Sequence, residues 1–128
     1  MAFNILETSI EAVHAAYQSG ELTCRQLVQM YLERIEAYDK KGPALNAIIT
    51  LNSKALEEAD RLDSHFKRSG LSGPLHGIPV VVKDQADVAG MPTTLGSVLF
   101  KDHIPERDCF LVSNFKKAGA IILGKTTL

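Results

Sequence analysis

Lys83 is the residue whose type and position in this chain most strongly suggest chemistry. It closes an apolar segment and stands where a turn begins, within residues 73–84, which read GPLHGIPVVVKD. Burial disfavours the charged form of an ammonium group, so a lysine held at the end of a buried strand can act as a base near neutral pH. A lone lysine is usually a surface residue, but Gly77, which permits unusual backbone angles, and Pro79, which fixes φ, together shape the entry to this strand. We therefore treat Lys83 as a candidate general base.

The other reactive side chains show no pattern of a metal or redox site. Cys24 and Cys109 are the only cysteines and form no C-x-x-C pair, and the four histidines lack the spacing of metal ligands. We interpret the cysteines as buried thiols of a reducing compartment. His76 is expected to be a hydrogen-bonding surface residue, and Ser97 a turn hydroxyl that bonds the backbone. No metal ion and no organic cofactor are expected.

Residues 119–126, GAIILGKT, match the phosphate-loop pattern G-x-x-x-x-G-K-[ST]. A genuine phosphate loop follows a strand, precedes a helix and loops around the phosphate between its glycines. Here helix-like residues come first, and the residues between the glycines are apolar and typical of a strand. Nucleotide binding is therefore a weak interpretation of this chain, and the two interpretations given below are favoured over it.

The first half of the chain is predicted to be mostly helical. Thr8 with Glu11, and Thr23 with Gln26, have the spacing of capping boxes. Apolar residues then recur every three or four positions. The sequence predicts a helix that ends at Gly20, a second that ends before Gly42-Pro43, a strand over Asn46–Leu51 and an amphipathic helix over Lys54–Arg68.

The second half mixes strands with a long loop. Ile78–Val82 does not alternate between apolar and polar residues, so we expect a strand buried on both faces. Residues 84–108 are rich in Gly, Pro, Thr and charge, which indicates a functional loop or an incomplete fold. A helix over Phe110–Lys117 and a buried strand over Ala120–Leu123 follow. The order predicts an α/β protein with N-terminal helices and part of a mixed β-sheet, one edge of which stays uncovered.

Composition limits the classes of partner. The 128 residues are 45% hydrophobic and 23% charged, with a formal net charge of −1, as in an ordinary globular domain. The basic residues are scattered, so neither nucleic acid nor an acidic membrane surface is expected as a partner. The N-terminus lacks a signal-peptide pattern, and the apolar runs are too short to span a bilayer. These features favour a cytoplasmic protein.

Several separated segments together resemble one known family. Besides residues 73–84, they are GMPTTLGS at 90–97, RDC at 107–109 and KAGAIILGKTT at 117–127. With the helices expected over residues 9–39 and 54–66, their order and spacing resemble the amidase signature family over nearly the whole chain. The resemblance implies that residues 1–128 are the N-terminal part of a single amidase-like domain. It would be helical over 1–70 and strand, loop, helix and strand over 71–128, an incomplete amidase signature fold.

In that family an amide is cleaved by a Ser–Ser–Lys triad. The lysine that closes the Gly-x-Pro-x-x-x-Lys pattern acts as the base, and Lys83 matches it. A middle serine relays the proton, and a third serine attacks the carbonyl carbon to form an acyl-enzyme. Both serines belong to a Gly/Ser-rich signature that follows the Gly-Lys-Thr stretch, and residues 1–128 contain no such run. Cys109 matches a position where such amidases often carry alanine, which favours a small core residue.

The resemblance therefore implies a hydrolase of a small-molecule amide, with one of three catalytic residues, Lys83, in this chain. We expect residues 1–128 alone to be inactive and to self-associate through an uncovered sheet edge. Large apolar side chains among Val80–Val82 and Ile121–Leu123 would then be exposed. The alternative interpretation is a non-catalytic truncated or pseudo-amidase module that interacts with another chain. Nothing in the sequence identifies the amide.

Overall fold

The computed structural model describes residues 2–128, and its helices and strands confirm the predicted α/β class. A π-helical turn, Ile35–Lys40, continues the second helix, and a short 3₁₀ turn, Val98–Phe100, interrupts the long loop. In chain order the main elements are α1 (Ile10–Ser19), α2 (Cys24–Arg34), β1 (Ile48–Leu51), α3 (Ala55–Ser69), β2 (Pro79–Lys83), α4 (Phe110–Lys117) and β3 (Ile121–Thr126).

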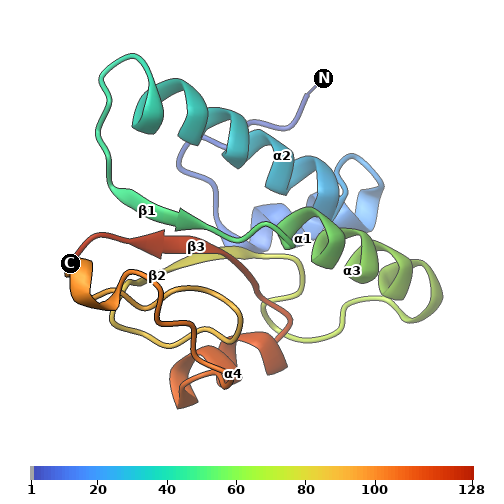
Figure 1. The fold of residues 1–128 in the computed structure, drawn as a ribbon. Coiled ribbons are helices and arrows are strands. Elements are labelled where there is room, and N and C mark those ends of the chain that lie inside the picture. The colour runs from blue at the N-terminus through green and yellow to red at the C-terminus, as the bar shows by residue number, and fades with distance from the viewer. Residues whose placement is uncertain (1) are drawn as a thin grey trace.

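The last strand in the sequence, β3, is the central strand of the sheet. The strand order is β1–β3–β2, with β1 antiparallel and β2 parallel to β3. The parallel register pairs Pro79 with Ile121 and Lys83 with Thr126. Figure 1 shows helices α1, α2 and α3 on one side of this sheet, and α4 with the long loop on the other. The predicted mixed sheet is thus confirmed, and its central strand is the last of the three in the sequence.

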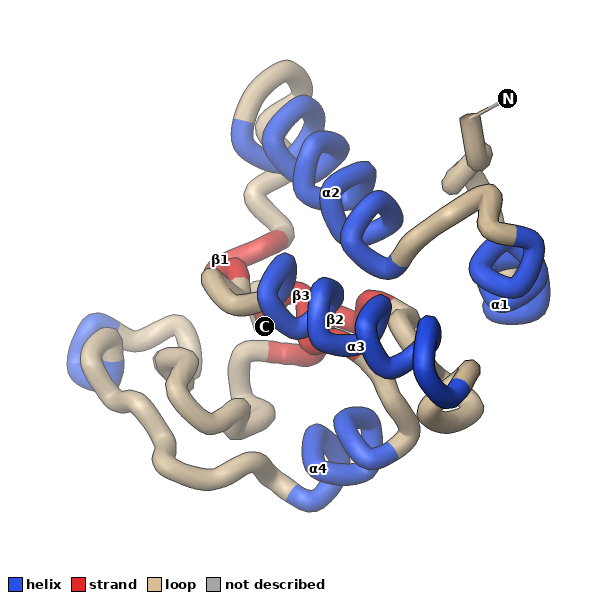
Figure 2. Tube along the Cα trace, turned by 90° about the vertical axis from the view of Figure 1, so that its right-hand side faces the viewer, coloured by secondary structure: helices blue, strands red, loops and turns tan. Residues whose placement is uncertain are grey.

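The core lies on both faces of β3. Ile121 and Leu123 pack in one apolar cluster with residues of α1, α2 and α3. Ile122 packs in a second cluster with Val112 of α4 and Val88 of the long loop. Burying one such aliphatic side chain stabilises a fold by roughly 1.5–3 kcal/mol. Alternate residues of β3 therefore connect the layer of helices α1, α2 and α3 with the layer of α4 and the long loop, and Figure 2 shows the strands between α2 and α4.

Side-chain caps fix where the first two helices begin. The predicted capping box of α2 is confirmed, since Thr23 Oγ1 accepts from the Gln26 N–H at 3.1 Å and the Gln26 side chain accepts from the Thr23 N–H at 2.9 Å. The capping box predicted to start at Thr8 is wrong. Ser9 caps α1 instead, because its Oγ accepts from the Ala12 N–H at 3.1 Å. Both helices gain partners for backbone donors that would otherwise be unpaired.

The first strand begins later than the sequence pattern suggests. Asn46 lies outside β1 and has a positive φ of 52°. The carboxylate of Asp39 accepts hydrogen bonds from the N–H groups of Ala47 and Ile48, at 2.6 and 3.3 Å. These donors are therefore satisfied by a side chain at the point where the predicted strand would have needed a neighbouring strand.

The burial predicted from the apolar patterns is wrong for β2 and confirmed for β3. In β2, Val82 is 6% exposed but Val81 is 46% exposed, so this strand is not buried on both faces. β3 runs on to Thr126, and Ala120–Leu123 are buried, as their apolar pattern predicted. The exposure expected at an uncovered sheet edge is found at Val81 and not at Ile121–Leu123. The reason is the strand order. β3 lies between two strands and two apolar clusters, whereas within residues 2–128 β2 has a strand on one side only.

The long loop over residues 84–108 is confirmed, and part of it is strongly apolar and exposed. Val98 and Leu99 are 78% and 90% exposed. Within residues 2–128 no helix has both the length and the hydrophobicity required to cross a bilayer. Val98 and Leu99 both belong to the short 3₁₀ turn Val98–Phe100.

The turn before β2 generates a stability prediction. Gly77 has a φ of +67°, and a Cβ atom at this position would lie against Cys24 Sγ and 2.9 Å from Tyr17 Cε2. Gly77→Val should destabilise the fold by about 2–5 kcal/mol, because about 1–2 kcal/mol of backbone strain adds to about 1–3 kcal/mol of overpacking. Urea denaturation of the purified variant measures this loss.

A matched glycine separates these two costs. Gly20 has a φ of +80°, but nothing lies within 4 Å of the position that a Cβ atom would occupy there. Gly20→Val should therefore show the strain alone, and Lys83→Ala should be milder still. Equal stability of the Gly77→Val and Gly20→Val variants would refute the crowding argument.

Candidate functional site

Lys83 lies where two parallel strands of the sheet finish side by side. β2 and β3 run parallel, and the register pairs Lys83 with Thr126. The side chain of Lys83 is exposed, and its Nζ donates a hydrogen bond to the carbonyl oxygen of Thr127 at 3.0 Å. Ligands of open α/β sheets bind beyond the carboxyl ends of the parallel strands. This edge is therefore a suitable place for a reacting group.

The burial expected for this ammonium group is not found within residues 2–128. Successive side chains of a strand point to opposite faces. Val81 and Lys83 share the exposed face, whereas Val82 and Asp84 share the buried one. Removal of the Lys83 ammonium group from water would require further polypeptide over the exposed face of β2.

A buried ion pair lies directly behind Lys83. Asp84 and Lys125 are both fully enclosed, and Lys125 Nζ lies 3.7 Å from Asp84 Oδ1. Thr94 completes the surroundings of the carboxylate, because its Oγ1 and its N–H donate to Asp84 Oδ2 at 2.6 and 3.2 Å. The loop that follows Lys83 is thus tied back onto the end of β2.

Lys125 reaches this loop because β3 carries a bulge. The register with β2 skips Leu123, so the side chains beyond it change faces. Lys125 Nζ can then donate to the carbonyl oxygen of Pro92 and to Thr93 Oγ1, each at 2.8 Å. An ammonium group that is removed from water needs such partners, and this one has them on both sides.

Opposing effects set the charges of the pair. Burial opposes ionisation of Asp84, but the hydrogen bonds from Thr94 and the charge of Lys125 outweigh it and hold the pKa of Asp84 below its ordinary value of 3.8. Burial lowers the pKa of Lys125 from 10.5, and the carboxylate of Asp84 opposes that change. The carboxylate is therefore ionised at neutral pH, and the pair is an electrostatic link between β2 and β3.

The Gly-Lys-Thr stretch is part of this link and is not a phosphate loop. Ile121–Thr126 is a strand, and the residues between the two glycines do not form a loop. A Cβ atom at Gly124 would lie 2.6 Å from the carbonyl oxygen of Thr50 in β1. Gly124 therefore permits the close approach of β1 to β3. Lys125 is paired with the carboxylate of Asp84. The geometry does not support the nucleotide-binding interpretation.

Asp84 and Lys125 are the residues that sequence reasoning missed. Asp84 was visible only as the neighbour of Lys83 in the motif. Lys125 was visible as a lysine inside an apolar strand pattern, and such a lysine is rarely buried without a partner. That rule could have predicted a buried carboxylate, although it could not have identified which one.

The other residues considered in the sequence analysis are hydrogen-bonded or buried parts of the fold and form no second reactive site among the described residues. Ser97 Oγ accepts from the Leu99 N–H at 3.2 Å, which confirms the turn hydroxyl. Cys24 is buried as predicted, but the burial predicted for Cys109 is wrong, because this residue is only half-buried. The prediction that His76 lies at the surface is wrong, because its ring is fully enclosed among residues of α1, α2 and α3. Among residues 2–128, no three His, Cys, Asp or Glu side chains are grouped to hold a metal ion.

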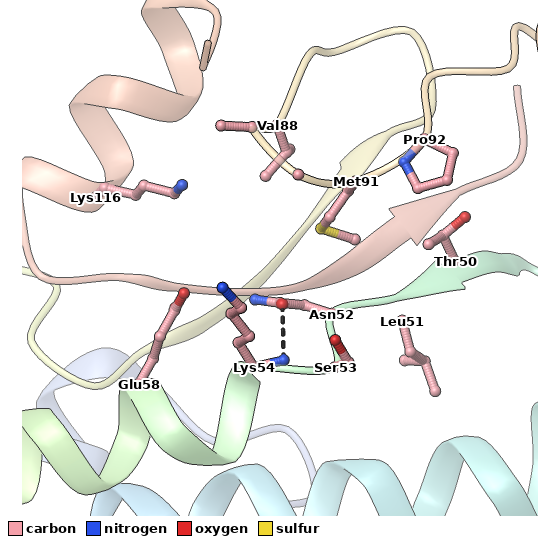
Figure 3. A pocket seen from close by; sticks show the side chains of 12 residues that line it. Thr50, Leu51, Asn52, Ser53, Lys54, Glu58, Val88, Met91, Pro92 and Lys116 are labelled. Carbon is pink, nitrogen blue, oxygen red and sulfur yellow. Dashed lines mark hydrogen bonds between the residues drawn. The ribbon is translucent and has the colours of Figure 1, made fainter. Parts of the chain in front are cut away.

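A polar cleft of about 240 Å³ lies between the start of α3 and the loop over residues 88–92. Figure 3 shows Asn52 on its floor, where the side-chain oxygen accepts from the Lys54 N–H at 3.0 Å. The Asn52 Nδ2 donates to the carbonyl oxygen of Ile122 at 2.8 Å, which fixes the floor to β3. Lys83 does not line this cleft, so the cleft and the candidate base are separate features.

Comparison with known proteins places this geometry in a family. The amidase family model matches residues 26–128. A solved peptide amidase with the inhibitor chymostatin superposes with a TM-score of 0.94 and 43% identity, over 98% of this chain and 26% of that one. The native peptide amidase of Stenotrophomonas maltophilia gives 0.92 and 43%, over 95% and 25%. The chain therefore belongs to the amidase family, as its resemblance to the amidase signature enzymes predicted.

A curated relative defines how much of such a protein is matched. One subunit of the glutamyl-tRNA(Gln) amidotransferase of Exiguobacterium sibiricum is 34% identical over 125 residues, which is 98% of this chain and 25% of the relative. The chain thus spans about a quarter of the length of the proteins it resembles. Lys83 and its buried neighbours lie inside the matched region.

The buried pair generates a prediction about stability. Asp84→Ala should lower the free energy of unfolding by about 3–5 kcal/mol, because it leaves the Lys125 ammonium group buried without its carboxylate. Urea denaturation at neutral pH measures this loss. An exposed pair provides the control, since Asp60 bonds Arg25 at 2.6 Å with both side chains about half exposed.

Asp60→Ala should cost under about 1 kcal/mol. A similar effect of Asp84→Ala and Asp60→Ala would show that the buried pair does not link the strands.

Proposed function

We propose that Lys83 of this chain is the general base of an amidase that cleaves an amide C–N bond through a Ser–Ser–Lys triad. One observation carries the proposal. Lys83 ends β2 at the open carboxyl edge of the sheet, inside the region that belongs to the amidase family. The buried Asp84 beside it keeps the strand end in place, so the amine has a defined position from which to act.

The chemistry would require two serines from polypeptide outside residues 1–128. The neutral amine of Lys83 would take a proton through the first serine, and the second serine would attack the amide carbonyl carbon. The C–N bond would break as the leaving nitrogen gains a proton, and water would then hydrolyse the acyl-enzyme. Further polypeptide over the exposed face of β2 would remove Lys83 from water, which favours its neutral form.

The substrate is proposed only as a small-molecule amide. The proteins compared above are one subunit of an amidotransferase, at 34% identity, and two solved peptide amidase structures, each at 43% identity. Residues 1–128 do not distinguish among the amides that such proteins handle. A cytoplasmic location, and the absence of nucleic acid and membrane from the partners, stay predictions from the sequence.

Substitution of the base tests the proposal. In a protein that carries this chain together with a Gly/Ser-rich segment, Lys83→Ala should reduce kcat by about 10²–10⁴, the usual contribution of a general base. Urea denaturation of residues 1–128 with the same substitution should show little change, because in this chain the side chain is exposed and bonds only the carbonyl of Thr127.

Lys101 supplies the matched control, since it is an exposed lysine in the long loop. Lys101→Ala should keep full activity. Retention of most activity by the Lys83→Ala variant would show that another group is the base.

A second candidate function is a non-catalytic module that associates with another chain. It is favoured by the exposed apolar side chains of Leu99 and Val81 and by the open side of β2 within residues 2–128. Strand edges of this kind recruit further strands. On this alternative, Lys83 would have no chemical role in any assembly.

Residues 1–128 alone should show no amide hydrolysis above buffer and should self-associate. A lysine without a nucleophile and oxyanion donors can only assist water weakly. Size-exclusion chromatography should give species larger than 14.0 kDa, and Val81→Lys, which adds charge to the open edge, should shift them toward the monomer. Hydrolysis that Lys83→Ala abolishes would disprove the inactivity, and a sharp monomer peak of the unmodified chain would disprove the association.

A further inference from the structure

The ring of His76 is the centre of a buried junction that precedes β2. Its relative exposure is 0%. The Nδ1 atom accepts a hydrogen bond from the Ser72 N–H at 3.1 Å and lies 2.8 Å from Ser72 Oγ. The Nε2 atom faces Cys24 Sγ at 3.6 Å. Both ring nitrogens are therefore occupied by groups from different segments, the turn before β2 and the start of α2.

These contacts define the protonation state of the ring. A backbone N–H can only donate, so the Nδ1 atom of His76 must be an unprotonated acceptor. The single proton of the neutral ring is then on Nε2, directed at the sulfur of Cys24. Protonation of Nδ1 would break the hydrogen bond from the Ser72 N–H, and only Ser72 Oγ, at 2.8 Å, could then accept from the new N–H. The Ser72 N–H therefore has its partner only when Nδ1 is unprotonated.

The same junction holds the backbone that leads to Lys83. The carbonyl oxygen of His76 accepts from His14 Nε2 at 2.9 Å. The next carbonyl, that of Gly77, accepts from Tyr17 Oη at 2.7 Å, and the Gly77 N–H donates to the carbonyl oxygen of Gly119 at 2.9 Å. β2 begins immediately afterwards at Pro79. The direction of β2 therefore depends on this short stretch.

We propose that His76 is a positioning residue whose neutral ring fixes the turn that directs β2, and that protonation of the ring releases this turn. Its connection with Lys83 rests on the proposed function, whereas the acid-sensitive junction does not. Protonation would break the Ser72 contact and loosen the stretch from residue 72 to residue 77. The start of β2 would then no longer be held in place, and the position of Lys83 at its end would vary.

The charges around the ring favour the neutral form. Burial lowers the pKa of His76 below its ordinary value of 6.5, and the nearby histidines add to this effect. Asp63 acts in the opposite direction, but its carboxylate already accepts from the backbone N–H groups of Cys24 and Arg25, at 2.7 and 3.1 Å. The titratable and charged groups that face the ring are His14 and Tyr17 of α1, Cys24 of α2, and Arg61, Asp63 and His65 of α3.

The sign of the pH dependence follows from this direction. The unfolded chain binds the proton near pH 6.5, whereas the folded chain binds it only at lower pH. Stability is therefore complete above about pH 6.5 and is lost as the pH falls through the folded pKa of His76. Each unit of depression corresponds to about a tenfold change in the unfolding equilibrium constant. Asp39 and Asp84, whose pKa values lie below 3.8, act in a separate and more acidic range.

Urea denaturation of residues 1–128 between about pH 7 and about pH 5 tests the proposal. The unmodified chain should lose stability across this range. His76→Asn should lose much less, because the Asn Oδ1 can accept from the Ser72 N–H but takes no proton. His103→Asn is the control and should behave as the unmodified chain, since His103 is exposed. An equal pH dependence in the His76→Asn variant would overturn the proposal.

An NMR titration of the unmodified chain keeps the test decisive if the variant does not fold. The ¹⁵N shifts should show the Nε2–H form of His76 with a midpoint below 6.5. The amide signals of Gly77 and Val80 should shift with the same midpoint, which a purely structural ring would not produce. A midpoint at or above 6.5, or unmoved amide signals, would overturn the proposal. Neither readout uses amide hydrolysis, so both are independent of the role proposed for Lys83.

Discussion

The ion pair between Lys125 and Asp84 is the interaction on which the arrangement of this chain depends. It connects the central strand, the end of β2 and the loop that follows, and both side chains are fully enclosed. Removal of two charges from water is costly, so the pair is stable only with its further donors in place. Successive side chains of β2 point to opposite faces of the sheet, so the direction of Asp84 sets the direction of Lys83. Because Asp84 points inward, Lys83 points outward at the open edge of the sheet.

The helices of this fold could be predicted from the sequence because their signals are local. The capping box at Thr23 and the amphipathic pattern of α3 each involve residues a few positions apart. The strands could be located, but which of them is buried on both faces could not be decided. Whether β2 or β3 is central depends on which strands pair, and pairing joins distant parts of the chain. A run of apolar residues looks the same in both positions.

Of the candidate site, the sequence indicates the residue inside the motif but not the buried residues that support it. Lys83 could be proposed as a base because a family motif surrounds it, and the family is shown by the match over residues 26–128. Asp84, Lys125 and His76 were missed because their roles depend on partners far along the chain. The sequence places His76 in a turn, and only the packing of three helices around that turn buries its ring.

Amide hydrogen exchange tests most directly whether the strand that ends in Lys83 is fixed to the central strand. The Asp84 N–H donates to the carbonyl oxygen of Thr126 at 2.9 Å, and the Ile121 N–H donates to that of Ile78 at 3.0 Å. Both amides should exchange only through global unfolding, with opening free energies equal to the stability measured in urea. The Lys101 amide, in the exposed loop, should exchange by local opening. Exchange of the Asp84 amide as fast as that of Lys101 would contradict the account.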